Sequence, residues 1–178
     1  MELVTARLRL RRAELGDLES MHEILSDRRA MRFWSTAPHR DLEQTRAWLA
    51  AMVADGPPLS DDFVIEHDGR VIGKAGAWRV PEIGFVLHPD YWGQGLAGEA
   101  VAAVIAHVFA SYDVDAITAE ADPRNDASVR LLKRLGFLET GFEAATYEIE
   151  GEVSDSVYLA LARARALGGP PAGRREAG

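Results

Sequence analysis

The chain of 178 residues contains no cysteine. A disulfide, a thiolate metal site and a cysteine nucleophile are therefore excluded, and the absence fits a reducing compartment. No stretch approaches the ~20 apolar residues of a membrane span. The opening, MELVTARLRLRR, alternates like a strand instead of forming the apolar segment of a signal peptide. We therefore expect a cytoplasmic protein with no membrane partner.

Positive charge is also scarce: the chain has 20 lysines and arginines and 28 aspartates and glutamates, which gives a net charge of −8. This balance argues against sequence-independent nucleic-acid binding and favours a cationic substrate. The five histidines show no i,i+4 pair and no zinc-motif spacing, so we expect no metal. A Gly-x-Ser-x-Gly motif is missing as well, which leaves a serine hydrolase without support.

The order of apolar patterns predicts one domain over residues 1–167, followed by a disordered tail, 168–178, of composition GGPPAGRREAG. We expect a strand at 7–11, helices at 17–26 and 41–54, strands at 63–66, 71–78 and 83–87, a long helix after Gly95, a strand at 116–121, a helix at 125–135, and strands at 147–149 and 153–161. This order predicts a mixed α/β sheet in which parallel pairing is required only across the long helix.

The turn between strand 83–87 and the long helix carries the most informative pattern. Gly93, Gly95 and Ala97 are small and bring main-chain N–H groups to the surface. The first N–H groups of a helix have no partner within it, and the helix dipole is positive there. The turn therefore predicts a seat for a phosphate, with a tight turn that binds nothing as the alternative.

Three motifs in register carry a resemblance to a known family. The segment YWGQGLA, 91–97, resembles the acetyl-coenzyme A pyrophosphate loop of the GNAT acyltransferases. The segment NDAS, 125–128, followed by Leu131 and KRLGF, 133–137, is similar to that family's second signature. The opening LVTARLRLRRAELGDL resembles the start of the RimJ/RimL branch, whose members acetylate protein amino termini and small amines. Together the resemblance covers roughly residues 3–161.

The resemblance implies a mixed, mostly antiparallel sheet of about seven strands, with helices on both faces and two splayed parallel central strands. It implies acetyl-coenzyme A as co-substrate, no metal, and a small amine or a protein amino terminus as acceptor; a homodimer is left open. The segment Phe33-Trp34-Ser35 is expected to wall the acceptor site. The implied coenzyme-binding residues are Phe85, Val86, Leu87, Trp92, Gly93, Gln94, Gly95, Leu96, Ala97, Asn125, Ser128 and Lys133.

Two residues depart from the family pattern. Trp92 stands where the general motif has glutamine or arginine, which backbone contacts to the coenzyme tolerate. Leu132 stands where many members have a tyrosine that protonates the leaving thiolate. Ser128, one helical turn earlier, is the candidate replacement, with a plain helix-turn serine as the alternative.

Direct transfer from a thioester to an amine requires a base, because an ammonium has no lone pair. Glu82 is the first candidate and Glu120, on a neighbouring strand, the second; a solvated or salt-bridged role is open for both. The main-chain N–H near Phe85 or Val86 would bind the oxyanion. The rival hypothesis is a catalytically silent coenzyme A-binding module, which Leu132 supports and the two glutamates oppose.

Overall fold

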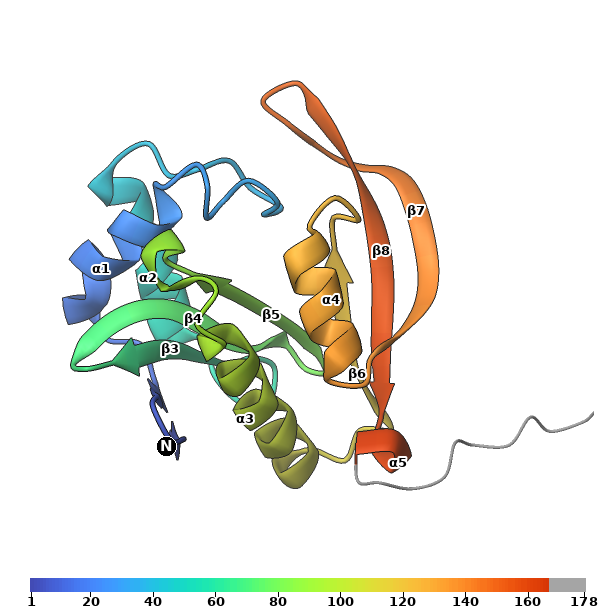
Figure 1. Ribbon diagram of the computed structural model, residues 1–178. Coiled ribbons are helices and arrows are strands. Elements are labelled where there is room, and N and C mark those ends of the chain that lie inside the picture. Colours follow the sequence, from blue (N-terminus) through green and yellow to red (C-terminus); the bar gives the residue numbers. More distant parts are fainter. Residues whose placement is uncertain (167–178) are drawn as a thin grey trace, which may run out of the picture.

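In the computed structural model, which describes residues 1–166, eight strands form one sheet in the order β1-β2-β3-β4-β5-β6-β8-β7 (Figure 1). The strands are β1 (Glu2–Val4), β2 (Arg9–Arg11), β3 (Asp61–His67), β4 (Arg70–Arg79), β5 (Glu82–Leu87), β6 (Ala116–Ala121), β7 (Leu138–Ile149) and β8 (Glu152–Ala162). The helices are α1 (Leu18–Leu25), α2 (Leu42–Ala54), α3 (Leu96–Ser111), α4 (Asp126–Arg134) and α5 (Arg163–Ala166), with short 3-10 turns at Leu15–Asp17 and Pro89–Tyr91.

The two central strands are the only parallel neighbours among the described residues. β5 and β6 share a single registered pair, Glu82 with Thr118, and then diverge (Figure 1). The expected mixed, mostly antiparallel sheet with two splayed parallel strands is thus confirmed. The sheet has eight strands where about seven were expected, because Glu2–Val4 pairs with Arg9–Arg11 as a separate strand.

The largest difference from the sequence-based expectation is β7. This strand begins at Leu138, whereas the sequence predicted a strand only from Tyr147 to Ile149. Its first part is exposed at the sheet edge, so its residues do not alternate between apolar and polar. The pairing with β8 also shifts register between Glu139 and Gly141 and between Glu143 and Tyr147, which breaks the two-residue period.

Side chains of successive strand residues point to opposite faces of the sheet, and this builds two cores. On β3, Phe63 and Ile65 face the core beneath α3 and α4, whereas Val64 faces the core beneath α1 and α2. The core beneath α1 and α2 reaches as far as Val86 on β5. On the same face of the sheet, the start of β5 and the neighbouring strands β6 and β8 carry polar side chains, which line the site described below.

The expected tail, 168–178, lies outside the described residues. Within residues 1–166, no helix combines the length and the apolar character needed to span a bilayer.

Candidate active site

The glycine turn between β5 and α3 has the backbone conformation that only glycine adopts without strain. Gly93 has φ 74° and Gly95, the residue before α3, has φ 78°. No atom lies within 4 Å of the position that a Cβ of Gly93 would occupy. The start of α3 has no side-chain cap, and a helix provides no partner for its own first N–H groups. Together with the space at Gly93, this fits an anion such as a pyrophosphate.

The first strands hold this turn in place through Arg7. The Arg7 guanidinium donates to the Gln94 carbonyl oxygen at 2.9 Å and to Glu99 Oε2 at 2.7 Å. Glu99 also accepts from the Thr5 hydroxyl at 2.6 Å. Sequence reasoning missed Arg7 and Glu99, because contacts between residues so far apart in the chain leave no local signal.

Some of the residues expected to bind coenzyme A have exposed side chains, and others have buried side chains. The indole N–H of Trp92 donates to the Leu87 carbonyl at 3.0 Å, so Trp92 braces the turn while 51% of its surface stays exposed. The side chains of Val86, Leu87 and Leu96 are buried, so these residues offer a ligand only their main chain.

The second signature lies at the start of α4. The Asn125 side chain accepts from the Ser128 N–H at 3.2 Å and caps the helix. Lys133 forms a 2.7 Å ion pair with Glu139 on the exposed side of the helix. Leu132 is 1% exposed and belongs to the core, so no side chain from that position reaches the cleft.

A cavity of about 580 Å³ lies on the polar face of the sheet, beside the point where β5 and β6 separate. Residues from the connection between α1 and α2, among them Phe33, Trp34 and Ser35, line one wall of it. Glu82 and Glu120 line it too, whereas Ser128 is not part of its lining. The lining carries one lysine, Lys74, against six carboxylates: Asp55, Asp62, Glu82, Glu120, Asp122 and Asp155.

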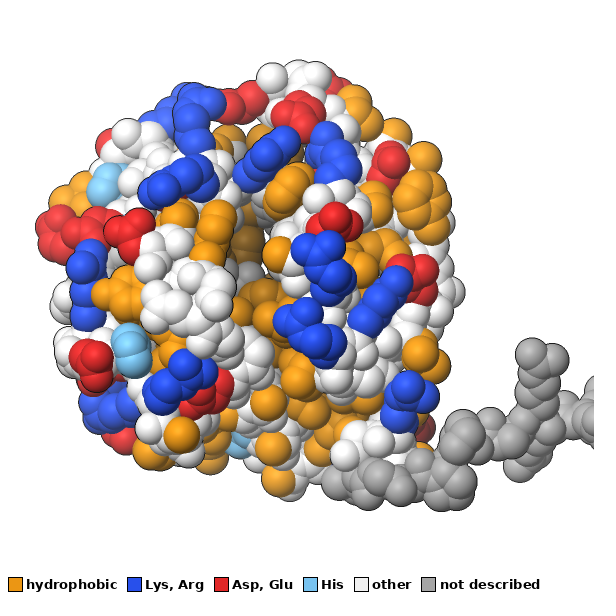
Figure 2. Space-filling view, viewed as in Figure 1, with side chains coloured by type: hydrophobic (Ala, Val, Ile, Leu, Met, Phe, Trp, Pro, Cys, Tyr) orange, Lys and Arg blue, Asp and Glu red, His pale blue; other side chains and the backbone are white. Residues whose placement is uncertain are grey.

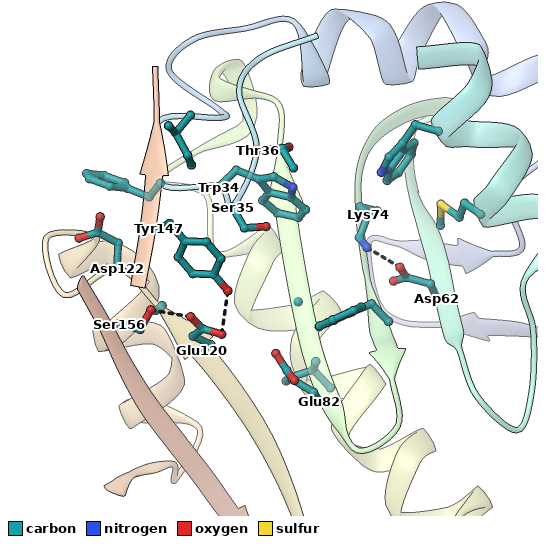
Figure 3. A pocket seen from close by; sticks show the side chains of 18 of the residues that line it. Trp34, Ser35, Thr36, Asp62, Lys74, Glu82, Glu120, Asp122, Tyr147 and Ser156 are labelled. Carbon is teal, nitrogen blue, oxygen red and sulfur yellow. Dashed lines mark hydrogen bonds and ion pairs between the residues drawn. The ribbon is translucent and has the colours of Figure 1, made fainter. Parts of the chain in front are cut away.

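The two glutamates have different surroundings within this cavity. Glu120 Oε1 accepts from the Ser156 hydroxyl at 2.5 Å, and Oε2 accepts from the Tyr147 hydroxyl at 3.2 Å (Figure 3). Burial, with a contribution from the charge of Glu120, raises the pKa of Tyr147 to about 12. The Glu82 side chain lies between the Glu120 group and Lys74, and burial, reinforced by the negative charge of Glu120, raises the pKa of Glu82 above its ordinary value.

Lys74, Asp62 and Tyr147 are site residues that sequence reasoning missed. Lys74 pairs with Asp62 and lies 5.8 Å from the Trp34 ring centre and 5.9 Å from that of Trp48. A charged lysine inside the otherwise apolar strand 71–78 was a usable signal for a buried ion pair. Within residues 1–166, no group of three or more histidine, aspartate or glutamate side chains is arranged to hold a metal ion.

Basic side chains lie on the face of the molecule that carries α3 and α4. Figure 2 shows a hollow in the face that carries α3 and α4, with lysine and arginine side chains gathered over α4 beside it. The basic residues of this helix are Arg130, Lys133 and Arg134. A phosphorylated ligand at the glycine turn would therefore meet positive charge, and a ligand in the cavity would meet negative charge.

Comparisons with known proteins agree with this arrangement. The family profile described as acetyltransferase (GNAT) domain matches residues 7–138. Among curated proteins, the uncharacterized N-acetyltransferase p20 of Bacillus licheniformis is 29% identical over 166 residues, which cover 88% of this chain and 93% of that protein.

Three solved structures share the fold. An acetyltransferase (GNAT family) from Bacillus anthracis has a TM-score of 0.79 at 25% identity, covering 91% of this chain and 98% of that one. A spermidine N-acetyltransferase from Vibrio cholerae in complex with CoA and spermine has a TM-score of 0.78 at 21% identity, covering 92% and 99%. RimL, a ribosomal L7/L12 alpha-N-protein acetyltransferase in complex with coenzyme A, has a TM-score of 0.77 at 17% identity, covering 91% and 98%.

Proposed function

The chain belongs to the GNAT acetyltransferase family, and we propose that it transfers the acetyl group of acetyl-coenzyme A to a small primary amine bound in the acidic cavity. The observation that carries the acceptor class is the cavity lining, which contains six carboxylates and one lysine. Asp62 pairs with Lys74, and Asp122 pairs with Arg124 at 2.6 Å. Among the described residues, the other four carboxylates form no ion pair: Asp55, Glu82, Glu120 and Asp155. A cation is the ligand that such a surface attracts.

Acetyl-coenzyme A supplies the acyl group as a thioester, and the glycine turn fits its pyrophosphate. The open space at Gly93 and the free N–H groups at the start of α3 support this assignment. Because β5 and β6 separate after Glu82, the main chain of Phe85 and Val86 lacks a parallel partner on that side. These N–H groups are suited to hold an extended chain alongside β5 and to stabilise the oxyanion.

Glu82 is our candidate for the base. Its raised pKa makes its carboxylate a better proton acceptor, and the ammonium of the acceptor must lose a proton before attack. Both oxygens of Glu120 already accept hydrogen bonds, so we assign Glu120 to holding the positive charge of the acceptor in place. Ser128, at the positive end of α4, is the candidate for stabilising or protonating the leaving thiolate.

Two kinds of acceptor are compatible with this chemistry. The spermidine N-acetyltransferase supports a small polyamine-like acceptor. The resemblance of the opening residues to the RimJ/RimL branch, together with the likeness to RimL, supports a protein amino terminus instead. We favour the small amine, because the carboxylates of the lining come from several elements, from the end of α2 to β8.

An acceptor screen tests the function. The purified protein is incubated with acetyl-coenzyme A and, in separate wells, with monoamines, diamines and peptides bearing free amino termini, and thiol release is followed. We expect release with amines that depends on the enzyme. If calorimetry shows coenzyme A binding but no amine or peptide releases thiol, the protein is a silent coenzyme-binding module.

A further inference from the structure

Two hydroxyl groups hold the carboxylate of Glu120 in the cavity. Ser156 donates to its Oε1 at 2.5 Å and Tyr147 donates to its Oε2 at 3.2 Å, so each oxygen has one donor (Figure 3). Ser156 is 1% exposed, which keeps its hydroxyl away from bulk water. A hydroxyl has a single proton to donate, and both of these protons are directed at the same carboxylate. Such hydrogen bonds stabilise a carboxylate in its charged form.

The pairing of β6 with β8 places Ser156 beside Glu120. Glu120 pairs with Tyr158, and Ser156 stands two residues before Tyr158 on the same strand. Side chains two residues apart on a strand point to the same face of the sheet. Ser156 is therefore a diagonal neighbour of Glu120 across two hydrogen-bonded strands, within reach of a long side chain.

Tyr147 reaches the same carboxylate because β7 changes register. Glu143 pairs with Ser156, so an unbroken ladder would place Tyr147 opposite Glu152. The register shift places Tyr147 opposite Ser154 instead. This position is two residues further along β8, which brings the tyrosine about 7 Å closer to the level of the carboxylate.

The backbone inside this register shift is strained. Ala145 has φ 56°, in the left-handed region that an alanine rarely adopts, and its N–H donates to Asp155 Oδ1 at 2.9 Å. Bulges and strained residues are frequent beside functional sites, where they direct a side chain. The irregular part of β7 thus serves to bring the Tyr147 hydroxyl into the cavity.

Glu82 lines the same cavity but lacks such donors. Within residues 1–166, no hydroxyl group donates to its carboxylate. Burial and, after it, the negative charge of Glu120 raise the pKa of Glu82, and the weaker effects of the Trp78 side chain and of the Arg79 charge do not cancel the rise. When two neighbouring carboxylates have such different surroundings, the one without donors is the better proton acceptor.

Resting on the proposed function, we propose that Ser156 and Tyr147 are positioning residues that act through Glu120 and leave Glu82 as the group that takes the proton of the acceptor. The two hydroxyl groups keep Glu120 ionised during the reaction. Its negative charge then stabilises the ammonium of the acceptor and the positive charge that forms on nitrogen during attack.

The proton balance of the reaction follows from these roles. The acceptor enters as an ammonium, and Glu82 takes one of its protons. The freed lone pair of the nitrogen forms a bond to the carbonyl carbon of the thioester, the carbon–sulfur bond breaks, and sulfur leaves with the electron pair as a thiolate. The second proton of the nitrogen passes to the thiolate, directly or through water. The products are an amide, a thiol and a protonated Glu82, which returns its proton to solvent.

A double-mutant cycle tests the proposal, with the amine that releases thiol fastest in the acceptor screen and with turnover as the readout. In the otherwise wild-type protein, Glu82→Gln should lower turnover by about 10²- to 10⁴-fold. In the protein that also carries Ser156→Ala and Tyr147→Phe, Glu120 has lost both donors and accepts the proton itself. The loss caused by Glu82→Gln should then be smaller by about tenfold or more, because each donor removed is a hydrogen bond to a charged group.

Tyr158→Phe is the matched control. The Tyr158 hydroxyl lies on β8 as well, but it donates to Glu143 at 3.0 Å and not to Glu120. In this variant, Glu82→Gln should lower turnover as much as in the wild-type protein. Tyr147→Phe alone, which keeps the aromatic ring, provides a milder variant that should reduce the loss in the same direction. Thermal unfolding and the Kd for acetyl-coenzyme A confirm that each variant is folded.

A purely structural role of the two hydroxyl groups gives a different result. Their removal would then lower turnover by the same factor whether residue 82 is glutamate or glutamine, and this outcome would overturn the proposal while the transferase stands. The same relief in Tyr158→Phe would overturn it too. Absence of thiol release by the wild-type protein with every amine and peptide would instead refute the proposed function, and the roles of both glutamates with it.

Discussion

Replacing Gly95 by alanine tests whether the glycine turn binds the coenzyme or merely connects β5 to α3. Gly95 has φ 78°, a left-handed conformation that costs an alanine about 1–2 kcal/mol. For a domain of this size, that cost lowers Tm by roughly 2–8 °C. Only the Arg7 side chain, at 3.6 Å, comes near the added Cβ, so the loss of stability comes from the backbone and not from a clash.

Gly151→Ala is the matched control. Gly151, in the turn between β7 and β8, has φ 83° and no atom within 4 Å of its Cβ position, so the same backbone cost applies on a different element. The Tm should fall by a similar amount in both variants. Gly95→Ala should also shift the N–H groups at the start of α3, and losing one charge-assisted hydrogen bond, about 1.5–3 kcal/mol, weakens coenzyme A binding by about tenfold or more.

Isothermal titration with acetyl-coenzyme A and thermal unfolding are measured on the same preparations. The reasoning predicts that stability falls in both variants and affinity falls only in Gly95→Ala. If Gly95→Ala binds acetyl-coenzyme A as tightly as Gly151→Ala does, the pyrophosphate does not lie on the first turn of α3. The assignment of the turn would then be wrong, whatever the stability data show.

Three further predictions concern the reaction and the fold. Glu82→Gln should lower turnover by about 10²- to 10⁴-fold near neutral pH and leave the Kd for acetyl-coenzyme A nearly unchanged. The turnover rate of the wild-type protein should rise as the pH rises through the raised pKa of Glu82. The same rise in the variant would exclude Glu82 as the base. Initial-rate plots at several amine concentrations should intersect, since both substrates are bound together; parallel lines with an acetyl adduct on the protein would indicate a covalent intermediate. Burial alone would raise the pKa of Asp61, but hydrogen bonds from Tyr112 at 2.6 Å and His107 at 2.7 Å lower it overall. A depressed folded-state pKa gives stability that is present above the unfolded value and is lost as pH falls through the folded one. Tyr112→Phe should therefore reduce the free energy of unfolding by about 1–2 kcal/mol at neutral pH, and less in acid; a difference from wild type that stays constant in urea titrations down to low pH would contradict this.

The sequence by itself determined the features whose causes are local. The turn at 91–97 needs glycines at positive φ and a helix start, and both follow from neighbouring residues. Asp68-Gly69 and Glu150-Gly151 form two-residue hairpin turns, which a glycine in the second position favours, with positive φ at both positions. The fold class followed from the order of these elements, because strands joined through one long helix must pair in parallel.

The extent of β7 could not be read from the sequence, because its exposed edge and its register shifts remove the alternation by which strands are recognised. The same limit applies to most of the site. Sequence reasoning named Glu82 and Glu120, yet only the folded sheet shows that Glu120 is held by Tyr147 and Ser156 whereas Glu82 lies apart from them. A one-residue change of register would have turned either glutamate to the other face.

The sequence carried a signal for a buried Lys74, but its pairing with Asp62 on β3 depends on the tertiary structure. The buried position of Leu132 likewise depends on how α4 packs against the sheet. Turn geometry is decided by neighbours in the chain, whereas the charge, depth and length of a cavity depend on contacts between distant strands, and the linear order of residues does not state those distances.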